Sequence, residues 1–329
     1  MRIIVYGVGA IGGTVAAALA LSGQEVVGIA RGAQFEALRS NGLLLRTPET
    51  TARAHFPCVA DPREIALRQD DAILLTMKTQ DTVAALERLR AAGVAGQPIF
   101  CVQNGVANER FALRRFPEVH GVTVMMPANL SAPGEVSVFS TPRYGIFDIG
   151  RYPHGRNRHD DALAQALEAA NISAFVTPEV MHSKHGKLIL NLSNILEATL
   201  GLDADYKRFA ALLRAEAEAA FRAAGITWHD VGASDPRREQ LMRYQPVAGV
   251  SRSGGSTTQS LARGTGSIET DYLNGEIVLL GRLHGVPVPA NAYFVDLSDR
   301  MVRDKLKPGA MSVGEVEAGL MAAGVGVGR

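Results

Sequence analysis

Short apolar runs alternate with helix-like stretches along the first part of the chain. Residues 2–6 are apolar, residues 14–21 are rich in alanine with helical spacing and end at Ser22-Gly23, and residues 25–30 form a second apolar run. Short apolar runs bounded by turn residues are typical of buried strands, whereas the longer alanine-rich stretch is typical of a helix. These segments predict one strand–helix–strand unit at the N-terminus.

The same alternation continues through the following residues. Apolar runs at residues 72–76 and 98–102 predict two more strands, and residues 81–93 between them have helical spacing and end at a glycine. Further strands are expected at residues 120–126, 134–140 and 144–150. Strands that alternate with helices are typical of an α/β fold with a doubly wound parallel sheet.

The pattern changes after Thr177-Pro178. Residues 181–224 are rich in alanine and leucine with helical spacing, a loop of serine, glycine and threonine covers residues 251–260, and another helical stretch starts near Thr270. We therefore predict two domains, an α/β domain at residues 1–178 and an all-helical domain at residues 179–329.

Composition and charge narrow the class of protein. Hydrophobic residues make up 47% and charged residues 20% of the chain, as in soluble globular proteins. The net charge of +1 gives no reason to expect nucleic-acid or membrane partners, so any anionic ligand must be held by a local site. The first residues already form a predicted strand without a secretory leader, and we expect a cytoplasmic protein. Cys58 and Cys101 lie far apart and are interpreted as structural.

Three glycines directly follow the first predicted strand. Gly7, Gly9 and Gly12 form a G-x-G-x-x-G pattern, which serves a tight turn, close approach to a pyrophosphate and packing of helix on strand. Ala10, Ile11 and Gly12 then offer free backbone N–H groups in the first helical turn. The pattern predicts a Rossmann-type dinucleotide site, with a purely structural glycine turn as the alternative.

Arg31 follows the second predicted strand, where NAD-binding folds commonly place an acid. An acid accepts hydrogen bonds from the ribose 2′-hydroxyl, whereas an arginine pairs with the 2′-phosphate of NADP. No acid stands among Ala30, Gly32 and Ala33. The sequence thus favours NADP(H), with a solvated surface arginine as the alternative.

Polar residues that could serve hydride-transfer chemistry stand at the ends of later elements. Lys78 and Asn104 follow predicted strands, where open α/β sheets bind their ligands. Lys187 and Asn191 are four residues apart on one helix face, and Glu269 begins a helix where it could orient a lysine. Taken singly, the two lysines could be surface residues, Asn104 part of a simple turn and Glu269 a helix cap.

Three histidines raise the question of a metal site. His182 and His185 are three residues apart and His284 lies elsewhere, but no carboxylate or third histidine stands at a suitable interval. We predict no metal site.

The chain resembles the ketopantoate reductase (2-dehydropantoate 2-reductase) family over nearly its whole length. The resemblance rests on GVGAIG, Arg31, TMKTQ, QNG, GKLILN and SIETDYLNG, in this order. It implies an NADP-dependent oxidoreductase that reduces a branched 2-keto acid, ketopantoate above all, to the D-2-hydroxy acid, with a place in pantothenate biosynthesis. Dimers are common in that family, so a homodimer is possible.

The resemblance also implies roles for individual residues. Lys187 would be the general acid that protonates the ketone oxygen, and Glu269 would hold and tune it. Asn191 would hydrogen-bond the substrate hydroxyl. Asn104 would lie near the nicotinamide and the carbonyl, and Lys78 near the reacting centre or the cofactor ribose.

Two further polar residues match the family on the substrate side. Ser256, in the loop of serine, glycine and threonine, matches the serine that contacts the substrate carboxylate. Asn274 is interpreted as a structural or substrate-side residue.

Two departures from the family pattern affect the predicted substrate. Ile195, followed by Leu196, stands where a second asparagine followed by proline is usual, and Asn194 comes one residue early. One residue turns a helix by about 100°, so we expect Asn194 not to replace the missing group. The stretch from Gln259 to Glu269 is one residue longer than the pattern.

These departures leave alternatives open. A more apolar 2-keto acid, as in a related D-mandelate-type dehydrogenase, is the second interpretation, because the pocket loses one hydrogen-bonding partner. A non-catalytic NADP-binding sensor is the third, which loss of Lys187 or Glu269 would have favoured; both residues are present.

Overall fold

The computed structural model describes residues 1–251, 254–264 and 266–326. The chain divides into two compact units, which are treated separately here. Unit 1 comprises Met1–Lys184 and Asp230–Arg252, and unit 2 comprises His185–His229 and Ser253–Arg329. Across the described residues, no helix is long and apolar enough to cross a membrane.

Unit 1 is built on an eight-stranded sheet in the order β13-β12-β8-β7-β6-β1-β2-β5. Its strands are β1 (Arg2–Tyr6), β2 (Val26–Ile29), β5 (Cys58–Val59), β6 (Asp71–Leu75), β7 (Ile99–Cys101), β8 (Val119–Met125), β12 (Ile146–Arg151) and β13 (Ser173–Val176). The strands from β5 to β8 are parallel, which confirms the predicted Rossmann-type sheet.

The far edge of the sheet adds an antiparallel strand to the predicted parallel sheet. β12 pairs antiparallel with β8, and β13 follows β12 in parallel. The chain returns from β8 to β12 through short strands rather than through a crossover helix, which is the usual connection between parallel neighbours.

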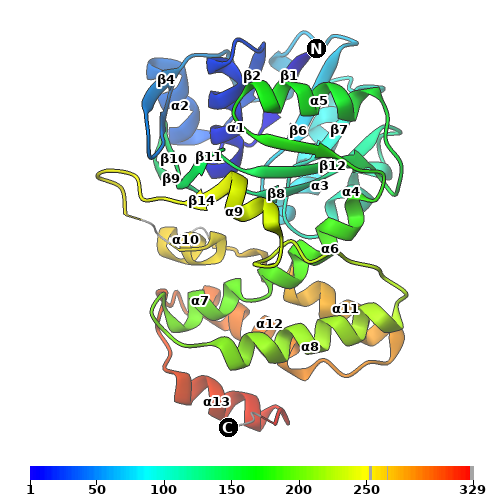
Figure 1. Cartoon of the computed structure of the whole chain (residues 1–329), viewed down its shortest axis with the longest axis vertical. Coiled ribbons are helices and arrows are strands. Elements are labelled where there is room, and N and C mark those ends of the chain that lie inside the picture. The colour runs from blue at the N-terminus through cyan, green and yellow to red at the C-terminus, as the bar shows by residue number, and fades with distance from the viewer. Residues whose placement is uncertain (252–253, 265, 327–329) are drawn as a thin grey trace. The chain divides into compact units, whose positions relative to one another are not determined.

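Helices cover both faces of this sheet (Figure 1). They are α1 (Ala10–Leu21), α2 (Gly32–Asn41), η1 (Pro62–Glu64), α3 (Thr79–Ala91), α4 (Asn108–Leu113) and α5 (Arg158–Ala169). Ile3 and Val5 of β1 pack in one core with α1 and α5, whereas Ile4 and Tyr6 pack in a second core with α3 and α4. Successive side chains of a strand point to opposite faces, so both faces of β1 are buried.

A second, four-stranded sheet in the order β4-β3-β10-β9 packs near α1. Its strands are β3 (Leu43–Arg46), β4 (Thr51–Ala54), β9 (Ala128–Ala132) and β10 (Glu135–Val138). The sequence analysis predicted a strand over β10 only and missed β3, β4 and β9.

Residues Asp230–Arg252, called the return segment below, come back to unit 1 after the chain has entered unit 2. The segment contains α9 (Pro236–Leu241) and β14 (Met242–Tyr244), and β14 pairs antiparallel with β11 (Ser140–Pro142). It appears in yellow in Figure 1, with α9 beside β12. The predicted division at residue 178 did not include this return, because the segment has no strong strand pattern of its own.

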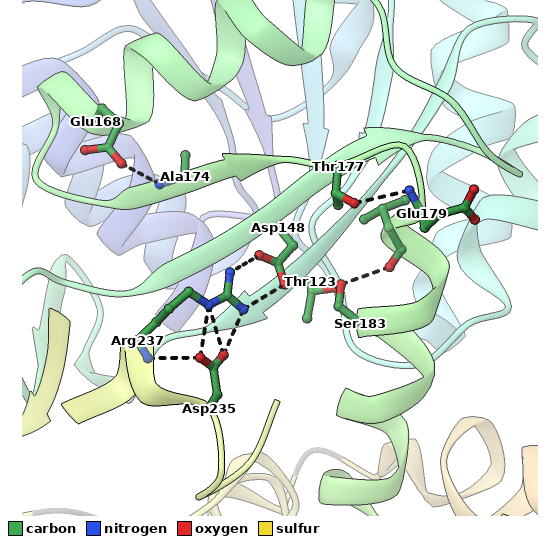
Figure 2. A network of polar contacts seen from close by, with 10 residues as sticks. Thr123, Asp148, Glu168, Ala174, Thr177, Glu179, Ser183, Asp235 and Arg237 are labelled. Atoms are coloured by element: carbon green, nitrogen blue, oxygen red, sulfur yellow. Dashed lines mark hydrogen bonds and ion pairs between the residues drawn. The ribbon is translucent and has the colours of Figure 1, made fainter. Parts of the chain in front are cut away.

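An arginine fixes the return segment to the sheet (Figure 2). Arg237 donates hydrogen bonds to Asp148 of β12, the shortest at 2.6 Å, and to Asp235, at 2.8 Å and 3.0 Å. Its guanidinium also lies 4.8 Å from the ring centre of Phe175. Burial favours the neutral acid, but the hydrogen bonds from Arg237 outweigh it, so the pKa of Asp235 is lowered.

All regular elements among the described residues of unit 2 are helices, as predicted for the C-terminal domain. Its helices are the second half of α6 (Val180–Asn191), then α7 (Asn194–Leu200), α8 (Lys207–Ala223), α10 (Ser256–Arg263), η2 (Glu269–Tyr272), α11 (Asn274–His284), α12 (Pro289–Arg303) and α13 (Val313–Ala322).

The helix that starts at Val180 ends at Asn191, and α7 begins three residues later. Asn194 and Ile195 are nevertheless consecutive residues of α7, so a helix rotation of about 100° still separates their side chains. Nδ2 of Asn274 donates to the carbonyl oxygen of Leu192 at this break, at 3.3 Å, and to Oδ1 of Asn291, at 3.1 Å. Asn274 thus joins α11 to the end of α6, a structural role.

Candidate functional site

The glycine turn connects β1 to α1 at the carboxyl edge of the sheet. Gly7 has a φ of +103°, and a Cβ there would lie 2.7 Å from the backbone nitrogen of Met77. A Cβ on Gly12 would overlap Oγ1 of Thr76. A Cβ on Gly9, in contrast, would meet no atom closer than 3.9 Å. Gly7 and Gly12 are therefore required by packing, whereas Gly9 leaves its backbone open to a ligand.

The first turn of α1 presents backbone donors beside that open position. Gly9 occupies the N-cap, and the first bond of the helical pattern runs from the N–H of Gly13 to its carbonyl oxygen, at 2.7 Å. The N–H groups of Ala10, Ile11 and Gly12 precede that bond, so helix geometry gives them no acceptor within α1. Such an end attracts an anion.

Arg31 stands two residues beyond β2, as the N-cap of α2, with an extended backbone. Its guanidinium is exposed and lies 4.0 Å from the carboxylate of Asp81, which is also exposed. An exposed ion pair at this distance contributes little to the free energy of folding. The guanidinium can exchange this partner for a phosphate.

Lys78 and Asn104 follow β6 and β7, which are neighbours in the sheet. Lys78 is the half-buried N-cap of α3, and Asn104 is half-buried in the turn before Gly105, whose φ is +76°. The two loops therefore lie at the same edge of the sheet, as the sequence predicted.

Buried side chains that the sequence analysis missed hold these two loops together. Nε2 of Gln103 donates to the carbonyl oxygen of Met77 and to Oγ1 of Thr82, both at 2.8 Å. Nδ2 of Asn108 donates to the carbonyl oxygen of Asn104 at 3.0 Å, and its Oδ1 accepts from Thr82 at 2.8 Å. The run of amides in QNGVAN was the available signal.

The first half of α6 is anchored within unit 1. Ser183 and Thr123 of β8 are linked by hydroxyls 2.8 Å apart (Figure 2). The ammonium of Lys184 lies 2.5 Å from the carboxylate of Glu109, and their side chains are 2% and 0% exposed. Lys184 also donates to the carbonyl oxygen of Gln103 at 3.0 Å. The sequence analysis missed this pair, although Lys184 stands three residues before Lys187.

The second half of α6 contains the predicted catalytic lysine. Lys187 is half-buried, and Asn191, one turn later on the same face, is 4% exposed. Nδ2 of Asn191 has no hydrogen-bond partner among the described residues. A buried amide nitrogen without an acceptor costs free energy unless a ligand or water satisfies it.

Ser256 and Glu269 also lie in unit 2. Ser256 is the first residue of α10, and its Oγ is a second buried polar atom that lacks a partner in the described part of the chain. Glu269 is the buried first residue of η2. Lys187, Asn191, Ser256 and Glu269 thus belong to unit 2, whereas the glycine turn, Arg31, Lys78 and Asn104 belong to unit 1.

The remaining candidates have structural surroundings. Ile195 is 1% exposed in α7, so its side chain is an interior one. No cluster of three metal-ligating side chains occurs within the described residues, and the ring of His185 packs edge-on against Phe221. Burial raises the pKa of both thiols, that of Cys58 to about 11, so neither is a thiolate near neutral pH.

A Rossmann-type unit that opens its first helix with a glycine turn, together with a helical unit, places the protein in the class of two-domain α/β proteins with a Rossmann-type sheet. Models of the family described as ketopantoate reductase PanE/ApbA, and of its C-terminal part, match residues 3–154 and 179–301. The chain belongs to the ketopantoate reductase family, a family of oxidoreductases.

Relatives that are similar in sequence or in structure match most of the chain. The 2-dehydropantoate 2-reductases of Caulobacter vibrioides and Pyrococcus horikoshii are 30% and 28% identical to it, over 90% and 88% of this chain and 97% and 94% of theirs. A PanE/ApbA family ketopantoate reductase from Ralstonia eutropha has a TM-score of 0.75 at 29% identity, covering 93% of this chain and 99% of its own. D-mandelate dehydrogenase with NADH and anilino(oxo)acetate has a TM-score of 0.74 at 21% identity, covering 99% and 100%.

Proposed function

We propose that the protein reduces a 2-keto acid with NADPH, and that ketopantoate (2-dehydropantoate) is its substrate and D-pantoate its product. The observation that supports this most is the pairing of Lys187 with Asn191 on α6. The half-buried Lys187 stands one helical turn from a buried amide nitrogen that has no hydrogen-bond partner among the described residues, which suits the oxygen atoms of a keto acid.

The residues of unit 1 fit a dinucleotide. The open backbone at Gly9 and the N–H groups of Ala10, Ile11 and Gly12 would hold the pyrophosphate, and Arg31 would pair with the 2′-phosphate of NADP. The bound nicotinamide supplies the hydride. Lys78 and Asn104, fixed by the buried amide network, would lie beside the reacting centre.

The residues of unit 2 would supply the proton and hold the substrate. Lys187 donates a proton to the ketone oxygen as hydride reaches the carbonyl carbon, which yields the hydroxyl. Glu269 orients the ammonium and keeps it charged. Asn191 hydrogen-bonds the hydroxyl, and Ser256 contacts the carboxylate.

A second candidate is a D-mandelate-type dehydrogenase for a more apolar keto acid. Ile195, which stands where the family pattern has an asparagine, favours it, because an apolar side chain there removes one hydrogen bond to a substrate hydroxyl. The predicted homodimer and cytoplasmic location stay predictions.

The test is the initial rate of NADPH oxidation with ketopantoate, 2-ketoisovalerate and benzoylformate, each repeated with NADH. We expect the highest kcat/KM for ketopantoate with NADPH. A preference for benzoylformate would favour the second candidate. Binding of NADPH without turnover of any keto acid would favour a sensor, and a preference for NADH would contradict the role of Arg31.

A further inference from the structure

Glu197 of α7 holds the first turn of α10 within unit 2. One oxygen, Oε1, accepts the backbone N–H of Gly255 at 2.5 Å and the hydroxyl of Thr258 at 2.8 Å. Gly255 is the N-cap of α10, and Ser256 is its first residue. A carboxylate at a helix N-terminus is favoured both by these hydrogen bonds and by the helix dipole.

The glycines before α10 make this contact possible. A Cβ on Gly254 would lie 2.6 Å from Oε1 of Glu197. The backbone φ of Gly254 is +81°, a value that residues other than glycine rarely adopt. A Cβ on Gly255 would lie 3.2 Å from the same oxygen. The Gly254-Gly255 pair therefore lets the backbone approach Glu197 closely.

This arrangement leaves the side-chain hydroxyl of Ser256, at the helix start, without a hydrogen-bond partner among the described residues. The N–H of Gly255 and the hydroxyl of Thr258 both go to Glu197, and the carbonyl oxygen of Ser256 accepts from Ser260 at 2.7 Å. The buried Oγ of Ser256 has no partner among the described residues. A bound carboxylate meeting this helix start would therefore find the hydroxyl of Ser256 available and the amide of Gly255 already taken.

We propose that Glu197 is a positioning residue for the substrate: by fixing the first turn of α10, it places the hydroxyl of Ser256 where it binds the carboxylate of the keto acid. This inference rests on the proposed function. Glu197 itself touches no reacting atom and acts through Ser256.

A double-mutant cycle tests the proposal in the full-length protein. Ser256→Ala, Glu197→Ala and the double variant are compared with the wild type for kcat and for the KM of ketopantoate and of NADPH. Each single substitution should raise the KM of the keto acid about tenfold, as the loss of one hydrogen bond to a charged group predicts, and leave the KM of NADPH unchanged. The KM of the keto acid should be no higher in the double variant than in Glu197→Ala, because a misplaced Ser256 no longer contacts the carboxylate and its removal costs nothing further.

Two further variants separate positioning from stability. Glu197→Gln keeps Oε1 as the acceptor of both hydrogen bonds, so it should restore most of the affinity that Glu197→Ala loses. Ser312→Ala removes the side-chain cap of α13 and should lower Tm without changing the KM of the keto acid. Two results would overturn the role of Glu197 without affecting the proposed function. They are additive effects of Glu197→Ala and Ser256→Ala on the KM of the keto acid, and an equal rise of that KM in Ser312→Ala. A wild-type protein inactive on every keto acid would overturn the proposed function, and this inference with it.

Discussion

Lys184 and Lys187 lie three residues apart on α6 but have different surroundings. The ammonium of Lys184 is enclosed with the carboxylate of Glu109 and backbone carbonyl oxygens, so its charge stabilises the first half of α6 within unit 1. Lys187 is half-buried, one turn from the amide nitrogen of Asn191, which lacks a partner within the part of the chain that the structure describes. The two lysines should therefore respond to substitution differently.

Replacing the proposed acid should affect chemistry rather than cofactor binding. We expect Lys187→Ala to lower the reductive kcat by about 100-fold to 10,000-fold, since general acids contribute that much, with little change in the Kd of NADPH. Steady-state rates and fluorescence titration measure the two quantities. Lys307→Ala removes an exposed lysine of the same unit and is the control. A collapse of NADPH binding with surviving turnover would mean that the role is misassigned.

Reversing the charge at position 31 should change the preference between cofactors. Arg31→Asp is expected to weaken NADPH binding at least about tenfold and NADH binding far less, because only NADPH has a 2′-phosphate. Arg39→Asp introduces the same charge change on α2 and should affect both cofactors little. Equal losses for NADPH and NADH in Arg31→Asp would show that Arg31 does not meet the phosphate.

At the scale of elements, the return segment depends on one arginine between two carboxylates. We expect Arg237→Met to lower the free energy of unfolding by about 2 kcal/mol at neutral pH, because Asp148 and Asp235 lose charged hydrogen bonds in a partly buried place. Denaturant unfolding measures this loss. Arg238→Met, on the same helix, is the control.

The stability difference between the wild type and Arg237→Met should depend on pH. The pKa of Asp235 is lowered from 3.8 in the folded protein, since the hydrogen bonds of Arg237 outweigh burial. The ionised Asp235 therefore contributes to the free energy of unfolding at pH values above its unfolded pKa. This contribution is lost as pH falls through the pKa of Asp235 in the folded protein. The difference in stability between wild type and Arg237→Met should narrow below pH 3.8, measured by thermal unfolding at a series of pH values. A difference that stays constant to lower pH would contradict this role of Asp235.

At the scale of the whole molecule, the fold of unit 1 requires residues beyond the predicted boundary. A fragment of residues 1–178 lacks Lys184 and Arg237, which leaves Glu109 and Asp148 buried without their cations. We expect this fragment to lack a cooperative thermal transition, followed by circular dichroism. Residues 1–184 joined by a flexible linker to residues 230–252 should unfold cooperatively. A cooperative 1–178 fragment would contradict the requirement.

Much of this architecture could be predicted because its signals are local. The alternation of apolar runs and helical stretches identified β1, α1, β2, β6, α3 and β7 to within a few residues. The glycine turn was predictable from three positions of one short loop. The roles of Lys187, Asn191, Ser256 and Glu269 came from the family resemblance, and they stay predictions.

The sequence by itself determined the Rossmann-type unit, the helical unit and the family, since periodicity and short motifs lie within single elements. Only the tertiary structure decided the antiparallel β12, the return segment and the partners of Lys184 and Glu197. Glu197 meets Gly255 across 58 residues of sequence, and Arg237 meets Asp148 across 89. Contacts at such separations depend on how the elements pack, and no local pattern of side chains specifies that packing.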